Sequence, residues 1–347
     1  METHSQVTSL EGQTDTSSPA LGRHRLRLGL RRFIAIVSVV AMALSLLLVS
    51  SYVLFPKNNQ SAFGMRHQEA HGILGEPENS IDVLFVGDSE TTSSISPLQI
   101  WKEQGFTSYV CASNGQKMPY GLSLLNCALD EQSPKVVAIE ANSIYASFSL
   151  KECAHRFLQD LFPVFEYHDR WKTVTPNDFI AIPVSTWTDP FKGFYVNEAK
   201  KPADAGSHME LTHEAERLPA LNKHYLRLFV ERCREAGATP VIIATPSTIC
   251  WNSKRHNGMA EAAEELGVDF VDLNDGPSRV DIDWNVDTRD AGDHLNYQGA
   301  VKVSCAVGRI LKDSYGLRDR RDDPAFGSWN ESLAIYEQSV PKEYAGN

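Results

Sequence analysis

Two short segments of the 347-residue chain carry the residue types that nucleophilic catalysis needs. The first is a G-D-S tripeptide that ends at Ser89, and the second is the segment D-A-G-D-H around His294. A serine hydroxyl attacks a carbonyl only after a base removes its proton, and the usual base is a histidine oriented by a carboxylate. Asp290 and Asp293 stand four residues and one residue before the histidine. The two segments together predict a Ser-His-Asp site for acyl transfer, although each alone is also typical of a capped turn.

The elements around these segments follow an alternating order. Short apolar runs predict buried strands at residues 81–86, 108–111, 135–140, 240–245 and 268–273. Apolar residues at helical spacing predict helices at residues 119–131, 221–236, 255–266 and 297–315. Strands that alternate with helices indicate βαβ units, so we expect an α/β three-layer sandwich with a central, mainly parallel sheet. Ligands of such sheets bind beyond the carboxyl ends of the strands, where Ser89 follows the first strand.

The N-terminal part predicts a membrane anchor. Residues 33–55 form an apolar run without a charge, and a helix of this length is roughly 34 Å long, enough to cross the hydrocarbon core. A cleaved signal peptide is the alternative, but its apolar region is usually shorter and ends at a small-residue site. Five arginines precede the run, so the positive-inside rule places residues 1–32 in the cytoplasm and the rest of the chain outside the membrane. We expect residues 1–32 to form a disordered tail with a basic cluster.

The external part divides into four segments. Residues 56–80 are predicted to be a linker, residues 81–316 the α/β domain, and residues 317–347 a polar C-terminal tail. Residues 146–220 interrupt the strand and helix pattern and are rich in aromatic residues and proline. We interpret them as an irregular insertion, and such segments often shape a substrate site.

Composition excludes some classes of function. The chain has 44 acidic and 33 basic residues, a net charge of −11, which argues against nucleic acid as a partner. Its six cysteines include no C-x-x-C pair and its histidines no H-E-x-x-H motif, so we expect neither a metal nor another cofactor. The sequence is compatible both with disulfides between these cysteines and with buried free thiols.

The two segments resemble the SGNH branch of the GDSL hydrolases, over roughly residues 81–316. That family has its serine in a G-D-S after the first strand and its acid and histidine just before the last helix. The wording F-V-G-D-S and D-H-L-N-Y-Q-G-A is similar to that of membrane-anchored bacterial members, and so is the segment at residues 162–171. The resemblance implies an SGNH-hydrolase-like fold.

The resemblance also implies a role for individual residues. The family's second block provides a glycine N–H to the oxyanion hole, and Gly115 is the matching residue. The third block, G-x-N-D, is missing, and Asn142 stands at the matching place as a candidate amide donor. The family spaces its acid three residues before the histidine, where this chain has Ala291. Asp290 is therefore our first choice for orienting His294, and Asp293 remains open.

Membrane-anchored relatives of this kind act on cell-envelope polymers. The resemblance therefore implies a serine esterase or O-acyltransferase that acts on acyl esters, acetyl above all, of envelope polysaccharide or peptidoglycan. A transferase would also need a multi-span partner that brings the acyl donor across the membrane. The alternative is a catalytically inactive envelope protein that keeps the fold for binding or assembly, as the altered acid spacing and the missing third block would allow.

Overall fold

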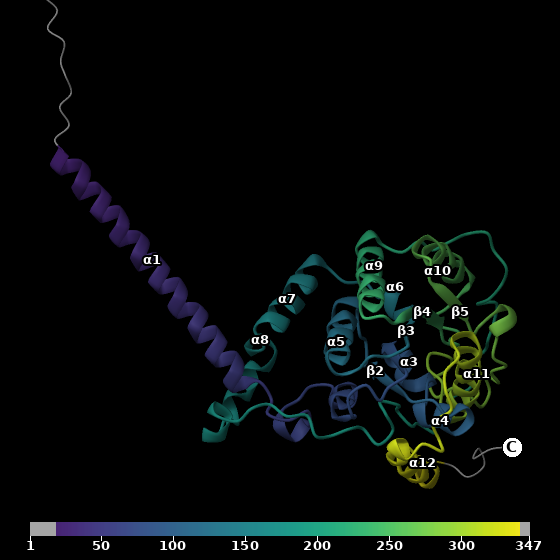
Figure 1. The fold of residues 1–347 in the computed structure, drawn as a ribbon. Coiled ribbons are helices and arrows are strands. Elements are labelled where there is room, and N and C mark those ends of the chain that lie inside the picture. Colours follow the sequence, from purple (N-terminus) through teal and green to yellow (C-terminus); the bar gives the residue numbers. More distant parts are fainter. Residues whose placement is uncertain (1–18, 341–347) are drawn as a thin grey trace, which may run out of the picture.

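A computed structural model describes residues 19–340 and shows one five-stranded sheet (Figure 1). All neighbouring strands are parallel, in the order β2-β1-β3-β4-β5. The strands are β1 (Val83–Gly87), β2 (Ser108–Ala112), β3 (Val136–Glu140), β4 (Thr239–Ala244) and β5 (Asp269–Asp272). The five strands and the parallel sheet expected from the sequence are thus confirmed. The chain moves from β1 to β2 on one side and then returns to β3 on the other, which makes the carboxyl end of β1 the switch point where ligands bind in such sheets.

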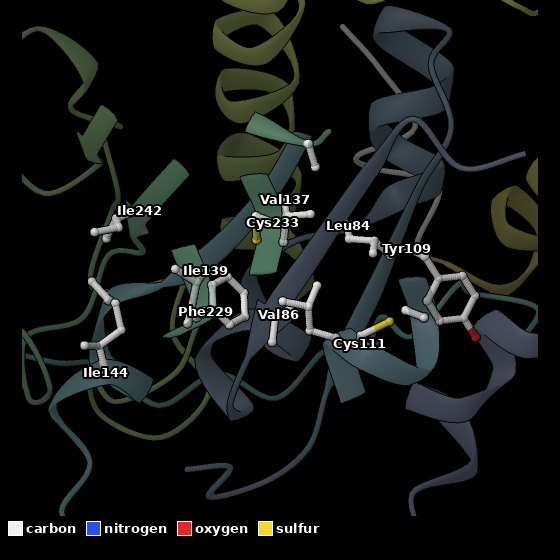
Figure 2. Close-up of a cluster of buried hydrophobic side chains, with 14 of the residues drawn as sticks. Leu84, Val86, Tyr109, Cys111, Val137, Ile139, Ile144, Phe229, Cys233 and Ile242 are labelled. Atoms are coloured by element: carbon white, nitrogen blue, oxygen red, sulfur yellow. The ribbon is translucent and has the colours of Figure 1, made fainter. Parts of the chain in front are cut away.

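Helices cover both faces of the sheet, as the three-layer prediction requires. Leu84 and Val86 of β1 point to one face, where they belong to the same core cluster as Phe229 and Cys233 of α9 (Figure 2). Val83 and Phe85 point to the opposite face, which is covered mainly by α11. Because both faces are buried, the middle residues of the strands are mainly apolar instead of alternating with polar residues.

The four helices expected from apolar spacing are present within two residues of their predicted bounds. They are α5 (Met118–Glu131), α9 (Ala220–Glu235), α10 (Ser253–Leu266) and α11 (Tyr297–Tyr315). The sequence did not resolve the shorter helices α2 (Gln68–His71), α3 (Ser89–Ser94), α4 (Pro97–Gln104), α6 (Ala141–Tyr145) and α12 (Gly327–Ser339). The polar C-terminal segment therefore folds in part, since α12 buries Trp329 and Tyr336.

The N-terminal helix α1 (Pro19–Leu54) projects away from the domain (Figure 1). Within it, the segment Arg27–Leu54 is long and apolar enough to cross a membrane, and none of its most apolar stretch is buried. The helix begins at Pro19, so the prediction of disorder is wrong for residues 19–32, while residues 1–18 lie outside the described part. Leucine and arginine are good helix formers, and this arginine-rich segment only has to extend a helix that the apolar run already forms.

Residues 56–80, predicted to be a linker, are instead packed into the domain. Ile73 is buried, and the buried Glu76 forms an ion pair of 2.7 Å with the buried Lys192. The side chain of Asn59 donates a hydrogen bond of 2.6 Å to the carbonyl of Trp187. These contacts join segments more than 110 residues apart, and a local sequence pattern contains no sign of them.

The insertion at residues 146–220 is partly helical. It contains α7 (Leu150–Leu161), α8 (Val164–Tyr167), and the 3₁₀ turns η3 (His168–Lys172) and η4 (Pro176–Phe179). No strand of the sheet falls within it, in agreement with its lack of strand periodicity. All six cysteines lie in the described part of the chain, and each is a free thiol there.

Candidate active site

Ser89 stands at the turn between β1 and α3, at the carboxyl end of β1, the strand at the switch point of the sheet. The turn needs a glycine at position 87, because a Cβ there would meet Thr91 Oγ1 at 2.1 Å and Glu140 Cβ at 2.7 Å. The carboxylate of Asp88 then caps α3 by accepting a hydrogen bond of 3.0 Å from the backbone N–H of Glu90. Ser89, the first residue of the helix, is only partly buried, so its hydroxyl is accessible to a ligand.

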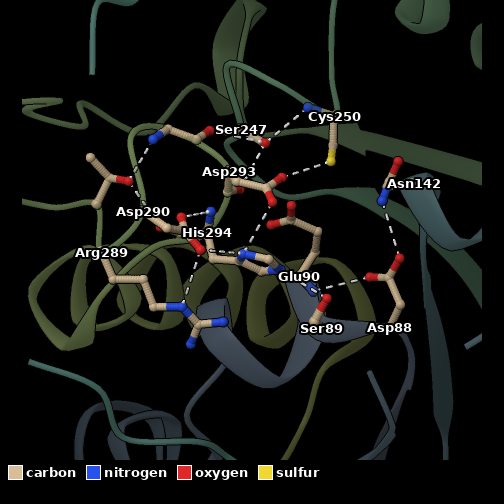
Figure 3. Close-up of polar contacts among 12 residues, drawn as sticks. Asp88, Ser89, Glu90, Asn142, Ser247, Cys250, Arg289, Asp290, Asp293 and His294 are labelled. Carbon is tan, nitrogen blue, oxygen red and sulfur yellow. Dashed lines mark hydrogen bonds and ion pairs between the residues drawn. The ribbon is translucent and has the colours of Figure 1, made fainter. Parts of the chain in front are cut away.

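A chain of hydrogen bonds connects this serine to a carboxylate (Figure 3). The Ser89 Oγ lies 2.8 Å from His294 Nε2, and His294 Nδ1 lies 2.7 Å from Asp290 Oδ2. With the Nδ1 proton donated to Asp290, Nε2 is free to accept the proton of the serine hydroxyl. The arrangement is therefore suited to generating a serine nucleophile, and it joins residues 205 positions apart in the chain.

The loop before α11 explains how an acid four residues before the histidine can reach it. Ala291 and Gly292 both have positive φ angles, of 65° and 93°, which turn the chain back on itself. Asp290 Oδ1 then accepts a hydrogen bond of 2.7 Å from the His294 backbone N–H, while Oδ2 faces the ring. A Cβ at position 292 would meet Thr248 Oγ1 at 2.0 Å, so the loop also packs closely against the segment after β4.

Asp293 occupies a different place. Its Oδ2 lies 3.5 Å from His294 Nδ1, and its Oδ1 accepts a hydrogen bond of 3.0 Å from the Cys250 thiol. The structure thus brings both candidate acids near the histidine, but the acid that accepts the hydrogen bond of the ring Nδ1 is Asp290.

Buried carboxyl groups lie directly behind the serine. Glu90 is fully buried, and its carboxyl oxygens have no hydrogen-bond partner within the described residues. Burial, together with the charges of Glu140 and Asp88, raises the pKa of Glu90 well above its usual range. Burial likewise raises the pKa of Asp88 and of Glu140. Burial thus favours the neutral forms of these three carboxyl groups.

The pKa of Asp290 is shifted the other way. Burial alone would raise it, but the hydrogen bonds from the backbone and ring of His294, with the charge of that ring and of Arg289, lower the net pKa. Arg289 Nε lies 3.5 Å from Asp290 Oδ2. Asp290 is therefore ionised at neutral pH, as an acid that stabilises an imidazolium must be.

The surroundings of the two candidate oxyanion donors, Gly115 and Asn142, do not establish their role. Gly115 lies in the exposed turn after β2 with a φ of 64°, and no atom lies within 4 Å of the position of a Cβ. Asn142, at the start of α6, donates a hydrogen bond of 3.1 Å to Asp88 Oδ2 and accepts one of 3.0 Å from Arg255. Asn142 is thus tied to the residue before the serine, and the roles of Gly115 and Asn142 as donors remain predictions.

Sequence reasoning missed several residues that hold the site together. Ser247 Oγ donates a hydrogen bond of 2.8 Å to the Asp293 carbonyl, and Cys250 contacts the side chain of the same residue. Both follow β4, so the rule that sites form beyond strand ends could have found them. Glu90 had no such signal, because nothing in the sequence distinguishes a buried glutamate from a surface one.

Two groups of side chains are close enough to share a cation. The ligand atoms of Glu90, Cys250 and Asp293 lie within 4.8 Å of one another, as do those of Asp290, Asp293 and His294. The second group includes His294 and Asp290, which are hydrogen-bonded to each other in the chain that begins at Ser89.

A cavity of about 760 Å³ adjoins the site. Its lining includes Thr92, three residues after the serine, and Arg289, next to Asp290. The insertion contributes a stretch from Asp189 to Asn197 that includes three aromatic rings. The Arg289 guanidinium lies over the ring of Tyr195, 5.4 Å from its centroid. The insertion thus lines a cavity near the Ser-His-Asp residues, and its role in shaping a substrate site remains a prediction.

A parallel α/β sheet whose switch-point strand leads into a hydrogen-bonded Ser-His-Asp set has the architecture of an α/β serine hydrolase. The solved structures similar to this chain are consistently GDSL-type lipolytic hydrolases and acylhydrolases, the family whose motifs the sequence resembles.

Three of these structures illustrate the level of similarity. A lipase/acylhydrolase from Enterococcus faecalis is 13% identical, with 70% of this chain and 99% of that chain covered and a TM-score of 0.36. A GDSL-like lipase from Bacteroides thetaiotaomicron is 11% identical, with 67% and 88% covered and a TM-score of 0.35. An acetyl xylan esterase is 14% identical, with 67% and 100% covered and a TM-score of 0.35. No family model and no curated protein matches the chain. The function proposed next therefore rests on the hydrogen bonds of Ser89, His294 and Asp290.

Proposed function

We propose that this protein is a membrane-anchored serine esterase or acyltransferase that acts on acyl esters, acetyl esters above all, of cell-envelope polysaccharide. The observation that carries the proposal is the hydrogen-bond chain from Ser89 Oγ through His294 to Asp290, with distances of 2.8 and 2.7 Å. Nucleophile, base and orienting acid are each within reach of the next, and the nucleophile is partly exposed.

The first half-reaction forms an acyl-enzyme. His294 Nε2 takes the proton of Ser89 as Oγ attacks the ester carbonyl, and the resulting imidazolium is stabilised by Asp290. The tetrahedral intermediate collapses when its C–O bond to the leaving alcohol breaks and His294 gives the proton to that alcohol. The Ser89 and Gly115 N–H groups, with Asn142, are the proposed oxyanion donors, and loss of one such donor typically costs about 100- to 1,000-fold in rate.

The second half-reaction decides between the two activities. His294 removes a proton from water or from a sugar hydroxyl, and the oxygen attacks the acyl carbon so that Ser89 Oγ leaves and takes the proton back. Water gives an esterase, whereas a sugar hydroxyl gives an acyltransferase. In the transferase, a multi-span partner would supply acyl groups from the other side of the membrane.

The cavity and the anchor support the substrate class. Sugars present both apolar C–H faces and hydroxyl groups, and the cavity offers aromatic rings beside Arg289 and Asp189. A polymer of the envelope stays near the membrane, so an enzyme held there by α1 meets it without diffusing away. The arginines that precede the apolar run favour a cytoplasmic N-terminus, with the catalytic domain outside the membrane.

The test is acetate release from O-acetylated polysaccharide by the full chain in detergent micelles. We expect the wild type to release acetate and Ser89→Ala to release none while it keeps its circular dichroism spectrum. A second reaction with a soluble acyl donor and a deacetylated glycan acceptor measures transfer. A folded wild-type protein that does neither, yet binds the polysaccharide as well as Ser89→Ala does, would establish the inactive binding protein instead.

A further inference from the structure

The C-terminal end of α1 is hydrogen-bonded to the insertion at residues 146–220. The last carbonyl groups of a helix have no partner within the helix. Here Arg170 Nη1 donates hydrogen bonds of 2.8 and 2.9 Å to the carbonyls of Leu54 and Phe55. The same guanidinium, with a side chain only 9% exposed, forms an ion pair of 3.0 Å with Asp178. A buried guanidinium that makes these three contacts fixes the helix end in one position.

Two further hydrogen bonds join the insertion to the last turn of α1. The Ser51 hydroxyl accepts one of 3.3 Å from the Val164 N–H, and the Tyr52 hydroxyl donates one of 2.8 Å to the Ala181 carbonyl. The segment from α8 to Ala181 therefore lies level with the last turn of α1. Since these hydrogen bonds and those of Arg170 join the helix end to three points of the insertion, the domain cannot swing freely about the helix.

Large apolar side chains surround this junction and are exposed. Six of them, which we name the apolar collar, are between 40% and 78% exposed. The collar consists of Phe157, Leu161, Phe165, Trp171, Ile180 and Ile182. Ile180 and Ile182 flank Ala181, the acceptor of the Tyr52 hydrogen bond, so part of the collar lies next to α1 by direct contact.

In the helix α7, the exposed apolar side chains lie on one side. Its apolar residues Leu150, Phe157, Leu158 and Leu161 recur at helical spacing and are all exposed. Residues on its other side contact the domain instead, for example Arg156, whose largely buried guanidinium lies 5.2 Å from the ring centroid of Tyr120 in α5. Figure 1 shows α7 diverging from α1 at α8 rather than running back along it. The apolar stripe of α7 thus has no partner within the described residues.

The depth of this junction in a membrane follows from α1. The apolar run ends at Phe55, and the last turn carries Tyr52, with the Lys57 ammonium 3.8 Å from its ring centroid. Tyrosine and lysine are typical of the membrane–water interface. Residues level with Tyr52 therefore lie at interface depth, where apolar side chains are buried among the headgroups and acyl chains.

We propose that the apolar collar inserts into the outer leaflet of the membrane that α1 spans, and that it holds the domain in one orientation on the lipid surface. The proposal rests on the membrane anchor proposed above and is independent of the Ser89 chemistry. Continuity with the end of α1 is what favours lipid over another protein, because part of the collar adjoins the end of a helix that is long and apolar enough to cross a membrane.

The test uses Trp171 as its reporter. The full chain is reconstituted into phosphatidylcholine–phosphatidylglycerol vesicles with or without brominated acyl chains, which quench only tryptophans that contact them. The difference between the wild type and Trp171→Phe isolates this residue from the other five tryptophans. We expect brominated lipid to quench at least half of the Trp171 emission and aqueous iodide to quench little of it.

Two variants in the Trp171→Phe background provide matched controls. Ile182→Trp moves the reporter within the collar and should be quenched by brominated lipid. Leu211→Trp places it at a residue that is 91% exposed and lies beside the start of α10, so iodide should quench it and brominated lipid should not.

Alkaline carbonate extraction of the same vesicles separates the possible failures. A chain that carbonate releases would overturn the anchor and the collar together. A chain that carbonate retains, but whose Trp171 and Ile182→Trp reporters respond to iodide and not to brominated lipid, would overturn the collar alone. Reporters shielded from both quenchers would show that a protein, such as a second copy, covers the collar and would likewise overturn its assignment to lipid.

Discussion

Replacement of Asp290 by asparagine tests the proposed orienting acid with little change in shape. The carboxylate and a charged His294 ring would attract each other by about 4 kcal/mol at a separation of about 4 Å and an effective dielectric constant of about 20. The side chain of Asp290 is 38% exposed, and solvent screening of this extent reduces the interaction to about half. A loss of about 2 to 4 kcal/mol corresponds to a fall in kcat of about 30- to 1,000-fold.

The assay is hydrolysis of p-nitrophenyl acetate by the full chain in detergent, with the rate of Ser89→Ala subtracted. Asp293→Asn is the matched control, because Asp293 lies 3.5 Å from the ring nitrogen and is hydrogen-bonded to Cys250. We expect this variant to keep at least a tenth of the wild-type kcat. Thermal unfolding of both variants shows whether a loss of rate reflects a loss of structure.

The reverse order of effects would refute the reasoning. If Asp293→Asn lost more activity than Asp290→Asn while both remained folded, Asp293 would be the orienting acid. Equal and small losses in both variants would mean that His294 needs neither carboxylate.

Two further predictions concern the loops beside the site. Gly292→Ala should lower kcat at least tenfold, because a Cβ there would meet Thr248 Oγ1 at 2.0 Å and because the residue has a φ of 93°. A variant with the kcat of the wild type would show that this turn does not position Asp290. Burial raises the pKa of Asp189 to about 6, above its value in the unfolded chain. The contribution of this group to the free energy of unfolding is therefore complete below about pH 4 and is lost as the pH rises through about 6. Asp189→Asn should abolish this pH-dependent fall in the free energy of unfolding, which amounts to at most about 3 kcal/mol. Urea unfolding between pH 4 and 7 measures it, and parallel profiles for the two proteins would contradict the shift.

The sheet was predictable from the sequence because its strands are buried on both faces. The stretches at residues 136–139 and 240–244 are apolar without interruption, and the helices between the strands show clear spacing. Ser89 and His294 were predictable for a related reason, since both stand at the ends of elements where parallel sheets place their ligands.

The remaining features depend on contacts between distant segments. The packing of residues 56–80 depends on Trp187 and Lys192, which lie in the insertion. Arg170 was interpretable as part of a family-like segment, but its hydrogen bonds to the end of α1 appear only when the two are folded together. The turn at Ala291 and Gly292 explains why the spacing of the acid departs from the family without removing it from the histidine.

The most direct test of the central claim, that Ser89 is an activated nucleophile, is labelling of the full chain with a fluorophosphonate, followed by peptide mapping with mass spectrometry. Attack by Ser89 Oγ would expel fluoride and leave a phosphonyl ester on this residue alone. We predict that the label maps to Ser89, is absent from Ser89→Ala and forms at least 100-fold more slowly on His294→Ala. A folded wild-type protein that stays unlabelled, or that carries the label on another residue, would contradict the claim.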